Sequence, residues 1–142
     1  MFACVEELVA KTQAVPVSSL KVIRNVRELN EDWVQWAKRF CKEKQCFSNA
    51  LNMSLIDGCS LVIGYVYLPS FGLAIEHAWN RDCEGDFDLT AQIFWGQDKE
   101  PAQYVELLCF EEGEAHEWRN KGGVDHLKLR MSNEYRHVFK QS

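Results

Sequence analysis

The sequence predicts an α+β fold, in which N-terminal helices and a helix that begins at Cys46 pack on an antiparallel sheet of four to five strands. Apolar residues recur at helical spacing near the start of the chain, which is typical of helices with one buried side. The segment Cys59–Leu68 is rich in β-branched and aromatic residues, and Leu73–Trp79 alternates like a strand with two different faces. These observations predict a single domain of 142 residues with helices first and strands after them.

Residues 1–44 are expected to be mainly helical. Residues 2–12 carry apolar side chains at helical spacing, and Pro16 ends that pattern because a proline disfavours helical geometry in the residue before it. Residues 20–29 fit either a helix or irregular packing. Asn30 is a typical N-cap residue, and the apolar stripe after it predicts a second helix that reaches Phe40.

Residues 45–110 are expected to form the core of the domain. A helix begins at Cys46, keeps one apolar side as far as Asp57, and stops at Gly58, a residue favoured just beyond a helix C-terminus. The strands are expected at Cys59–Leu68, Leu73–Trp79, Asp86–Ile93 and Gln103–Phe110. Residues 111–142 form a C-terminal segment, with a helix over Glu111–Arg119 and no clean periodicity in Asp125–Phe139.

Composition and charge disfavour several classes of protein. The net charge of −5 argues against a nucleic-acid binder, because binding to phosphates needs clustered lysine and arginine. No apolar run approaches the roughly 20 residues of a membrane span. The N-terminus turns acidic at once and lacks the basic region of a signal peptide. We therefore expect a cytoplasmic protein, in its own cytosol or in that of a host.

The six cysteines are expected to be free thiols. They are widely spread in a chain that is large enough to fold without crosslinks, and a reducing cytosol keeps thiols free. No C-x-x-C motif is present and the four histidines are scattered, so we expect no metal and no cofactor. Cys83, in a polar hairpin tip, is expected to be exposed, whereas Cys41, Cys59 and Cys109 suit burial.

Cys46, His77 and Asp88 carry the groups that an activated cysteine nucleophile needs. A thiol requires a base to become a thiolate, and the base requires an acceptor that fixes its tautomer. The positive end of the helix dipole beside Cys46 favours the thiolate further. Taken alone, such a cysteine is most often a packing residue, and such a histidine a satisfied core residue. Their order and neighbours favour catalysis.

His77 and Asp88 are expected on neighbouring strands of a hairpin, where the loop length decides whether they share a face. A four-residue loop over residues 81–84 places them directly opposite, and one over residues 82–85 places them diagonally, within reach of a hydrogen bond. A loop of odd length separates them unless a bulge restores the face. The same parity keeps Asp86 possible as the acceptor, while Thr90 favours Asp88.

His77-Ala78-Trp79-Asn80, followed by Asp88 and Thr90, resembles the His-Ala-Trp … Asp-Pro-Thr signature of transglutaminase-like proteins. These belong to the papain-like group, whose members share a cysteine at a helix N-terminus packed on an antiparallel sheet. The resemblance covers residues 45–95, and Leu89 stands where the signature has proline. It implies that Cys46 is the nucleophile, His77 the general base and Asp88 its orienting partner.

The resemblance leaves one part of the site unassigned. The glutamine upstream of the papain cysteine is absent at its normal distance, and Gln45 is the nearest side-chain amide for an oxyanion hole. The backbone N–H of Cys46 is the other expected donor. Trp79 is expected to form a wall of the site, and Asn49 to cap backbone first and contact substrate second.

The expected function is cysteine-dependent acyl transfer on an amide of a protein or peptide substrate, through a thioester intermediate. Deamidation, cleavage of a peptide or isopeptide bond, and transfer to an amine all remain open. The alternative is a non-catalytic phage- or pathogen-type interaction protein that binds and inhibits a host protein. That protein would keep the fold but would not need a reactive thiol.

Overall fold

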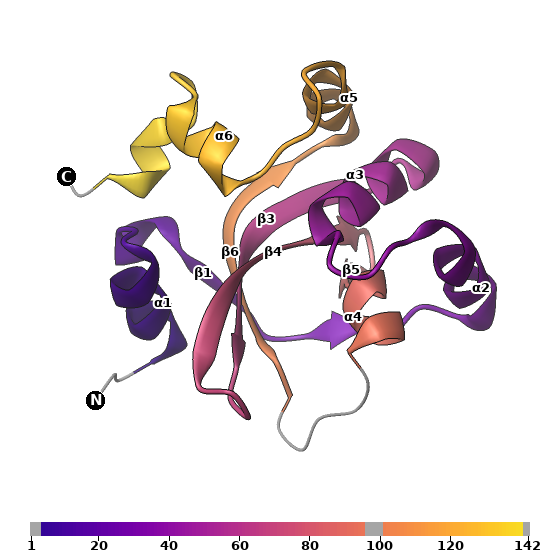
Figure 1. Cartoon of the computed structure of the whole chain (residues 1–142), viewed down its shortest axis with the longest axis horizontal. Helices are drawn as coiled ribbons and strands as arrows, with labels where there is room; N and C mark the ends of the chain where they lie inside the picture. Colours follow the sequence, from indigo (N-terminus) through magenta and orange to yellow (C-terminus); the bar gives the residue numbers. More distant parts are fainter. Residues whose placement is uncertain (1–3, 96–100, 141–142) are drawn as a thin grey trace.

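A computed structural model describes residues 4–95 and 101–140 and shows an α+β fold built on one curled, six-stranded sheet (Figure 1). The strand order is β1-β6-β3-β4-β5-β2, and all neighbours are antiparallel except β5 and β2. The strands are β1 (Lys21–Ile23), β2 (Val26–Arg27), β3 (Ser60–Leu68), β4 (Leu73–Asp82), β5 (Gly85–Phe87) and β6 (Gln103–Phe110).

Six α-helices surround this sheet: α1 (Val5–Gln13), α2 (Glu31–Phe40), α3 (Cys46–Asp57), α4 (Leu89–Phe94), α5 (Glu112–Asn120) and α6 (His126–Met131). Two short 3₁₀ helices, Val17–Ser19 and Arg136–Phe139, complete the described part of the chain. None of its helices has both the length and the apolar character that crossing a membrane requires.

The chain itself forces the sheet to curl. Strands β1 and β2 form its two edges, yet only Arg24 and Asn25 separate them in sequence. Three Cα–Cα steps from Ile23 to Val26 span at most about 11 Å. The edges of a flat sheet of six strands would lie about 24 Å apart, since neighbouring strands are about 4.8 Å apart. The sheet therefore closes toward a barrel, and the 24–25 link joins its edges.

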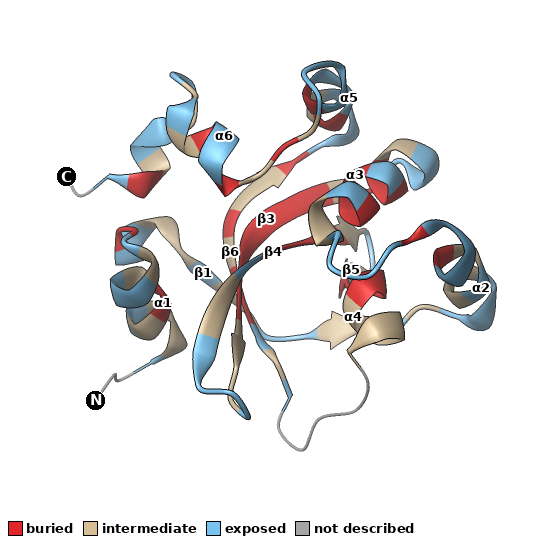
Figure 2. Ribbon diagram, in the orientation of Figure 1, coloured by how far each residue is buried: buried red, intermediate tan, exposed pale blue. Residues whose placement is uncertain are grey.

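The two faces of the sheet have different neighbours. One face packs against α1, α3, α5 and α6, and its core includes Leu61, Ile63, Tyr65 and Ala78. The other face lies inside the curl, where Val62, Val66, Trp79 and Tyr104 are buried. Figure 2 shows buried residues on the inner sides of α1, α3 and α5 and the central strand β3 buried along most of its length.

A bulge in the pairing of β3 with β6 decides which residues of β6 enter the curl. The register shifts between Ile63 and Gly64, and beyond the shift Val66 pairs with Tyr104. In the unshifted register Tyr104 would pair with Tyr67 and lie on the helix-covered face. The bulge therefore turns the Tyr104 side chain into the enclosed face.

Several expectations from the sequence are confirmed. Asn30 caps α2 by accepting a hydrogen bond from the Trp33 N–H at 3.2 Å, and α3 runs from Cys46 to a left-handed Gly58. The strands expected near residues 59–68, 73–79 and 103–110 are β3, β4 and β6, and the helix expected at 111–119 is α5. Their signals are local caps and periodicities.

Three expectations about the sheet are wrong. It has six strands rather than four to five, and it is mixed rather than antiparallel, because the ambiguous residues 20–29 supply both edge strands. The expected strand Asp86–Ile93 ends at Phe87 and continues as α4. Asp88 is the reason for the change: its carboxylate accepts the Ala91 N–H at 3.1 Å and so caps a helix at this point.

Candidate active site

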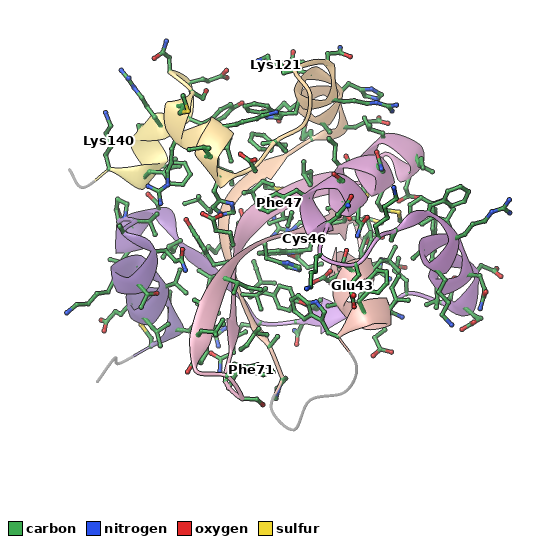
Figure 3. The ribbon with its side chains drawn as sticks, in the orientation of Figure 1. Glu43, Cys46, Phe47, Phe71, Lys121 and Lys140 are labelled. Carbon is green, nitrogen blue, oxygen red and sulfur yellow. The ribbon has the colours of Figure 1, made fainter. Side chains whose placement is uncertain are left out.

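The N-terminus of α3 presents Cys46, which is half-buried, at the first helical position (Figure 3). The N–H groups of a first helical turn have no partner within the helix, and the helix dipole makes this end partly positive. Both features favour an anionic sulfur and, next to it, an anionic oxygen.

Asn49 holds the loop that leads into this helix. Its side chain accepts the Lys42 N–H at 3.0 Å and donates to the Lys42 carbonyl at 2.8 Å. It also donates to the Thr90 hydroxyl at 3.1 Å, which ties α3 to α4. Asn49 therefore makes the backbone contacts that were expected of it first, and its amide is engaged within the protein rather than facing a ligand.

His77 and Asp88 form a buried pair. Nε2 of His77 lies 2.6 Å from Oδ2 of Asp88, and both side chains are 2% exposed. The β4–β5 register pairs Arg81 with Asp86, so His77 and Asp88 are diagonal neighbours. This is the register expected for a loop over residues 82–85, although Asp82 and Gly85 themselves pair and the turn is residues 83–84. Because Nε2 is directed at Asp88, Nδ1 is the ring nitrogen that is left for a thiol.

The charge state of His77 follows from its neighbours. Burial of the ring opposes protonation, but the charge of Asp88, the hydrogen bond to Asp88 and the side-chain interaction with Cys46 together raise the pKa of His77 to about 10. At neutral pH the ring is thus an imidazolium that bridges the carboxylate and the sulfur. This arrangement brings together the three residues that were expected to act as a triad.

A third residue contacts the carboxylate. The Tyr104 hydroxyl donates to Oδ2 of Asp88 at 2.7 Å, while Oδ1 accepts the Ala91 N–H. Asp88 thus has donors from β4, β6 and α4. Sequence reasoning placed Tyr104 in a strand but missed its role, because a register shift far from the motif decides its direction.

Aromatic rings enclose the His77 imidazole. The Trp95 ring centroid lies 4.8 Å from that of His77, and the rings of Trp79 and Tyr104 both lie 6.2 Å from it. Trp79 is buried and donates its Nε1–H to Asp86 at 2.7 Å, so it is an inner wall that does not face solvent. Trp95 was not expected in the site; no local pattern distinguished it.

Asp86 and Gln45, the two remaining candidates from the sequence, both lie near triad residues in the chain. Asp86 accepts from Trp79 and from Arg81 Nε at 2.7 Å, so it is occupied away from His77. Gln45 is exposed at the N-cap of α3, and its side chain makes no capping hydrogen bond. Gln45 directly precedes Cys46 in the chain. Its expected role in an oxyanion hole stays a prediction.

A cleft of about 820 Å³ opens beside the carboxylate end of this group. Asp88, Trp95 and Tyr104 contribute to its lining, together with residues from the β1–β2 link and the ends of β3 and β4. The walls combine aliphatic and aromatic side chains with polar ones, among which Arg24 and Asn25 are exposed. Cys46 and His77 lie outside its lining, so the cleft borders the triad rather than containing the thiol.

The six cysteines are all free thiols. Cys41 and Cys59 are buried as expected, Cys83 is exposed as expected, and Cys109 is half-buried. Burial raises the pKa of Cys41 to about 11 and that of Cys59 to about 12, so these thiols stay protonated near neutral pH. Within the described ranges, histidine, cysteine and acidic side chains form no group of three that could hold a metal ion.

The family models, the curated proteins and the solved structures that were searched gave no match to this chain.

Proposed function

We propose that this chain is a papain-like, transglutaminase-like cysteine enzyme that acts on an amide carbonyl of a protein or peptide. The observation that carries the proposal is the buried His77–Asp88 hydrogen bond, with Cys46 acting on the same imidazole from a helix N-terminus. A core histidine without a catalytic role also needs a hydrogen-bond partner, but it does not need a half-buried thiol beside it.

In the proposed reaction, the Cys46 sulfur attacks the carbonyl carbon of the substrate and forms a carbon–sulfur bond. The carbonyl oxygen becomes an oxyanion, for which the free N–H groups of the first turn of α3 are suitable donors. The imidazolium of His77 then gives its proton to the leaving nitrogen as the carbon–nitrogen bond breaks.

A thioester on Cys46 remains, and His77 is now neutral. Water or an amine attacks the thioester carbonyl while His77 takes the proton of the attacking group, and the sulfur leaves as the thiolate. If the leaving group is ammonia, the reaction is deamidation. If it is a peptide amine or a lysine amine, the reaction is cleavage of a peptide or an isopeptide bond. An amine as the second nucleophile gives transfer.

The decisive experiment compares thiol reactivity and activity. At pH 5.5, iodoacetamide should alkylate Cys46 at least about 10-fold faster than exposed Cys83, because the imidazolium of His77 acts on the Cys46 sulfur and favours its anionic form. Peptide mass spectrometry assigns each site. His77→Ala should remove the advantage of Cys46, and release of ammonia or amine from a panel of glutamine- and lysine-containing proteins should vanish in Cys46→Ala.

Equal alkylation rates at Cys46 and Cys83 would refute the proposal. Full biological effect in Cys46→Ala would instead support the interaction protein, which binds its target without a reactive thiol. Circular dichroism of each variant checks the fold. The check matters most for His77→Ala, because this substitution removes a fully buried ring and leaves Asp88 without its partner.

A further inference from the structure

Tyr104 contacts the triad from a strand that the triad motif does not include. It lies 16 residues beyond Asp88, and it is buried on the enclosed face of β6. Its hydroxyl and Nε2 of His77 converge on the same oxygen, Oδ2 of Asp88, at 2.7 and 2.6 Å. An oxygen that receives two donors in this way is held in position from two strands, β4 and β6.

The route by which Tyr104 reaches this oxygen is specific. Only the shifted register of β6 directs its side chain into the curl, and the shift occurs at Gly64, whose backbone lies directly against β6. A tyrosine that served only as apolar filling would not need its hydroxyl at 2.7 Å from a carboxylate. Here the hydroxyl completes the set of donors around Asp88, with the His77 ring and the Ala91 N–H.

We propose that Tyr104 is a positioning residue of this site, which acts through Asp88 and sets the orientation of His77 and the pH range in which Cys46 is reactive. The inference rests on the proposed function. A buried carboxylate is stabilised in its charged form by each donor it accepts. Tyr104 therefore stabilises the Asp88 carboxylate and holds it in place, and this carboxylate keeps His77 protonated and aligned beside the sulfur.

Other titratable groups close to Asp88 come from several elements. His77 faces it from β4, Tyr104 from β6 and Cys41 from the end of α2, while Cys46 acts on His77 from α3. Burial and the charge of Asp88 raise the pKa of Tyr104 far above its ordinary value. Tyr104 thus remains a donor, and Cys41 remains a neutral thiol, through the whole acid range of the experiment.

Tyr104→Phe removes only the hydroxyl. The rate of Cys46 alkylation should fall at low pH, and we call this part of the pH–rate profile the acid limb. We expect the acid limb to move to a pH about one unit higher, the size expected for one lost hydrogen bond to a charged group. With an identified substrate, kcat should fall about 10-fold while KM stays nearly unchanged, because the hydroxyl that is removed contacts Asp88. The low-field Nε2–H proton resonance of His77 should also shift.

Tyr65→Phe is the matched control. Tyr65 is a fully buried tyrosine on neighbouring β3, but its side chain lies on the helix-covered face, where its ring lies 4.8 Å from that of His126. The Tyr65→Phe variant should leave the acid limb and the His77 resonance unchanged. If Tyr104→Phe merely lowers the melting temperature and leaves both unchanged, its role is structural and the inference is overturned.

The readouts separate the two proposals. If the wild-type protein shows no activity but the His77 resonance shifts in Tyr104→Phe alone, the positioning role stands and the proposed function fails. If the protein is active and neither the resonance nor the acid limb responds, the proposed function stands and the positioning role is lost.

Discussion

At the scale of single residues, the site depends on one carboxylate. Asp88 caps α4 with Oδ1 and takes two side-chain donors on Oδ2, so one residue ends β5's extended segment, starts a helix and anchors the histidine. A buried carboxylate without such donors would be costly. The structural and chemical roles of Asp88 therefore support each other.

Asp88→Asn should separate these roles. An asparagine can still cap α4, since Asn and Asp are similarly good N-caps, but it lacks the charge that keeps His77 protonated. We expect activity to fall about 100-fold or more, and the melting temperature to fall as well, because the substitution breaks a buried charge pair while it keeps the helix cap. Steady-state kinetics and thermal unfolding measure the two effects.

Asp82→Asn, in the same hairpin, is the control for this change. Asp82 pairs with Arg27 and is part-exposed, away from the His77 ring. Its activity should match the wild type. A fully active Asp88→Asn protein would show that the buried pair serves only the fold.

At the scale of elements, the bulge between β3 and β6 determines the geometry of the site. Gly64 is the residue at the shift, and a Cβ atom added there would lie 2.1 Å from the Val105 carbonyl oxygen. Backbone atoms cannot move aside as the end of a flexible side chain can. Glycine is therefore required here for the close approach of two strands.

Gly64→Ala should push β6 away and displace Tyr104. We expect a loss of about 2–4 kcal/mol in the free energy of unfolding, as for other overpacked core sites, and a reduced rate of Cys46 alkylation. Gly113→Ala is the matched control, because Gly113 lies in α5 with open space around it. Alanine in a helix is neutral to stabilising. Urea unfolding compares both variants, and equal stabilities would contradict the role given to Gly64.

At the scale of the whole molecule, two buried histidines respond to pH in opposite directions. His126 is the first residue of α6, and its ring contacts those of Phe47, Tyr65 and Phe139. Burial lowers the pKa of His126 to about 4. Arg130, Asp125 and the charge of His77 also act on it. His77 has its pKa raised to about 10.

The signs give a stability maximum near pH 6.5, the ordinary pKa of histidine. Between about pH 6.5 and 4 the unfolded chain binds more protons at His126 than the folded chain, so this stability is lost on acidification. Above pH 6.5 the folded chain holds the His77 proton more tightly, so that contribution is lost as pH rises toward 10.

His126→Phe tests the acid side. It keeps an aromatic ring among aromatic neighbours but removes the titration. Wild-type protein should lose about 2 kcal/mol of unfolding free energy from this group between pH 7 and pH 5, measured by urea unfolding, and the variant should lose correspondingly less. Parallel losses in the two proteins would show that His126 does not titrate in this range.

Local signals in the sequence predicted much of the fold and the pairing of His77 with Asp88. Asn30 and Gly58 marked helix ends, periodicity located α3, β3, β4 and β6, and parity allowed His77 and Asp88 to meet. Such signals depend on neighbours within a few residues, where backbone geometry and side-chain spacing are set by the chain alone.

The tertiary structure decided the rest. It closed the sheet through the 24–25 link, made Asp88 a helix cap, placed Trp95 against the His77 ring and, through the bulge at Gly64, turned Tyr104 toward the carboxylate. Each of these depends on which distant strands pair and in which register. A shift of one residue reverses the face of every side chain that follows, and no short window of sequence records that shift.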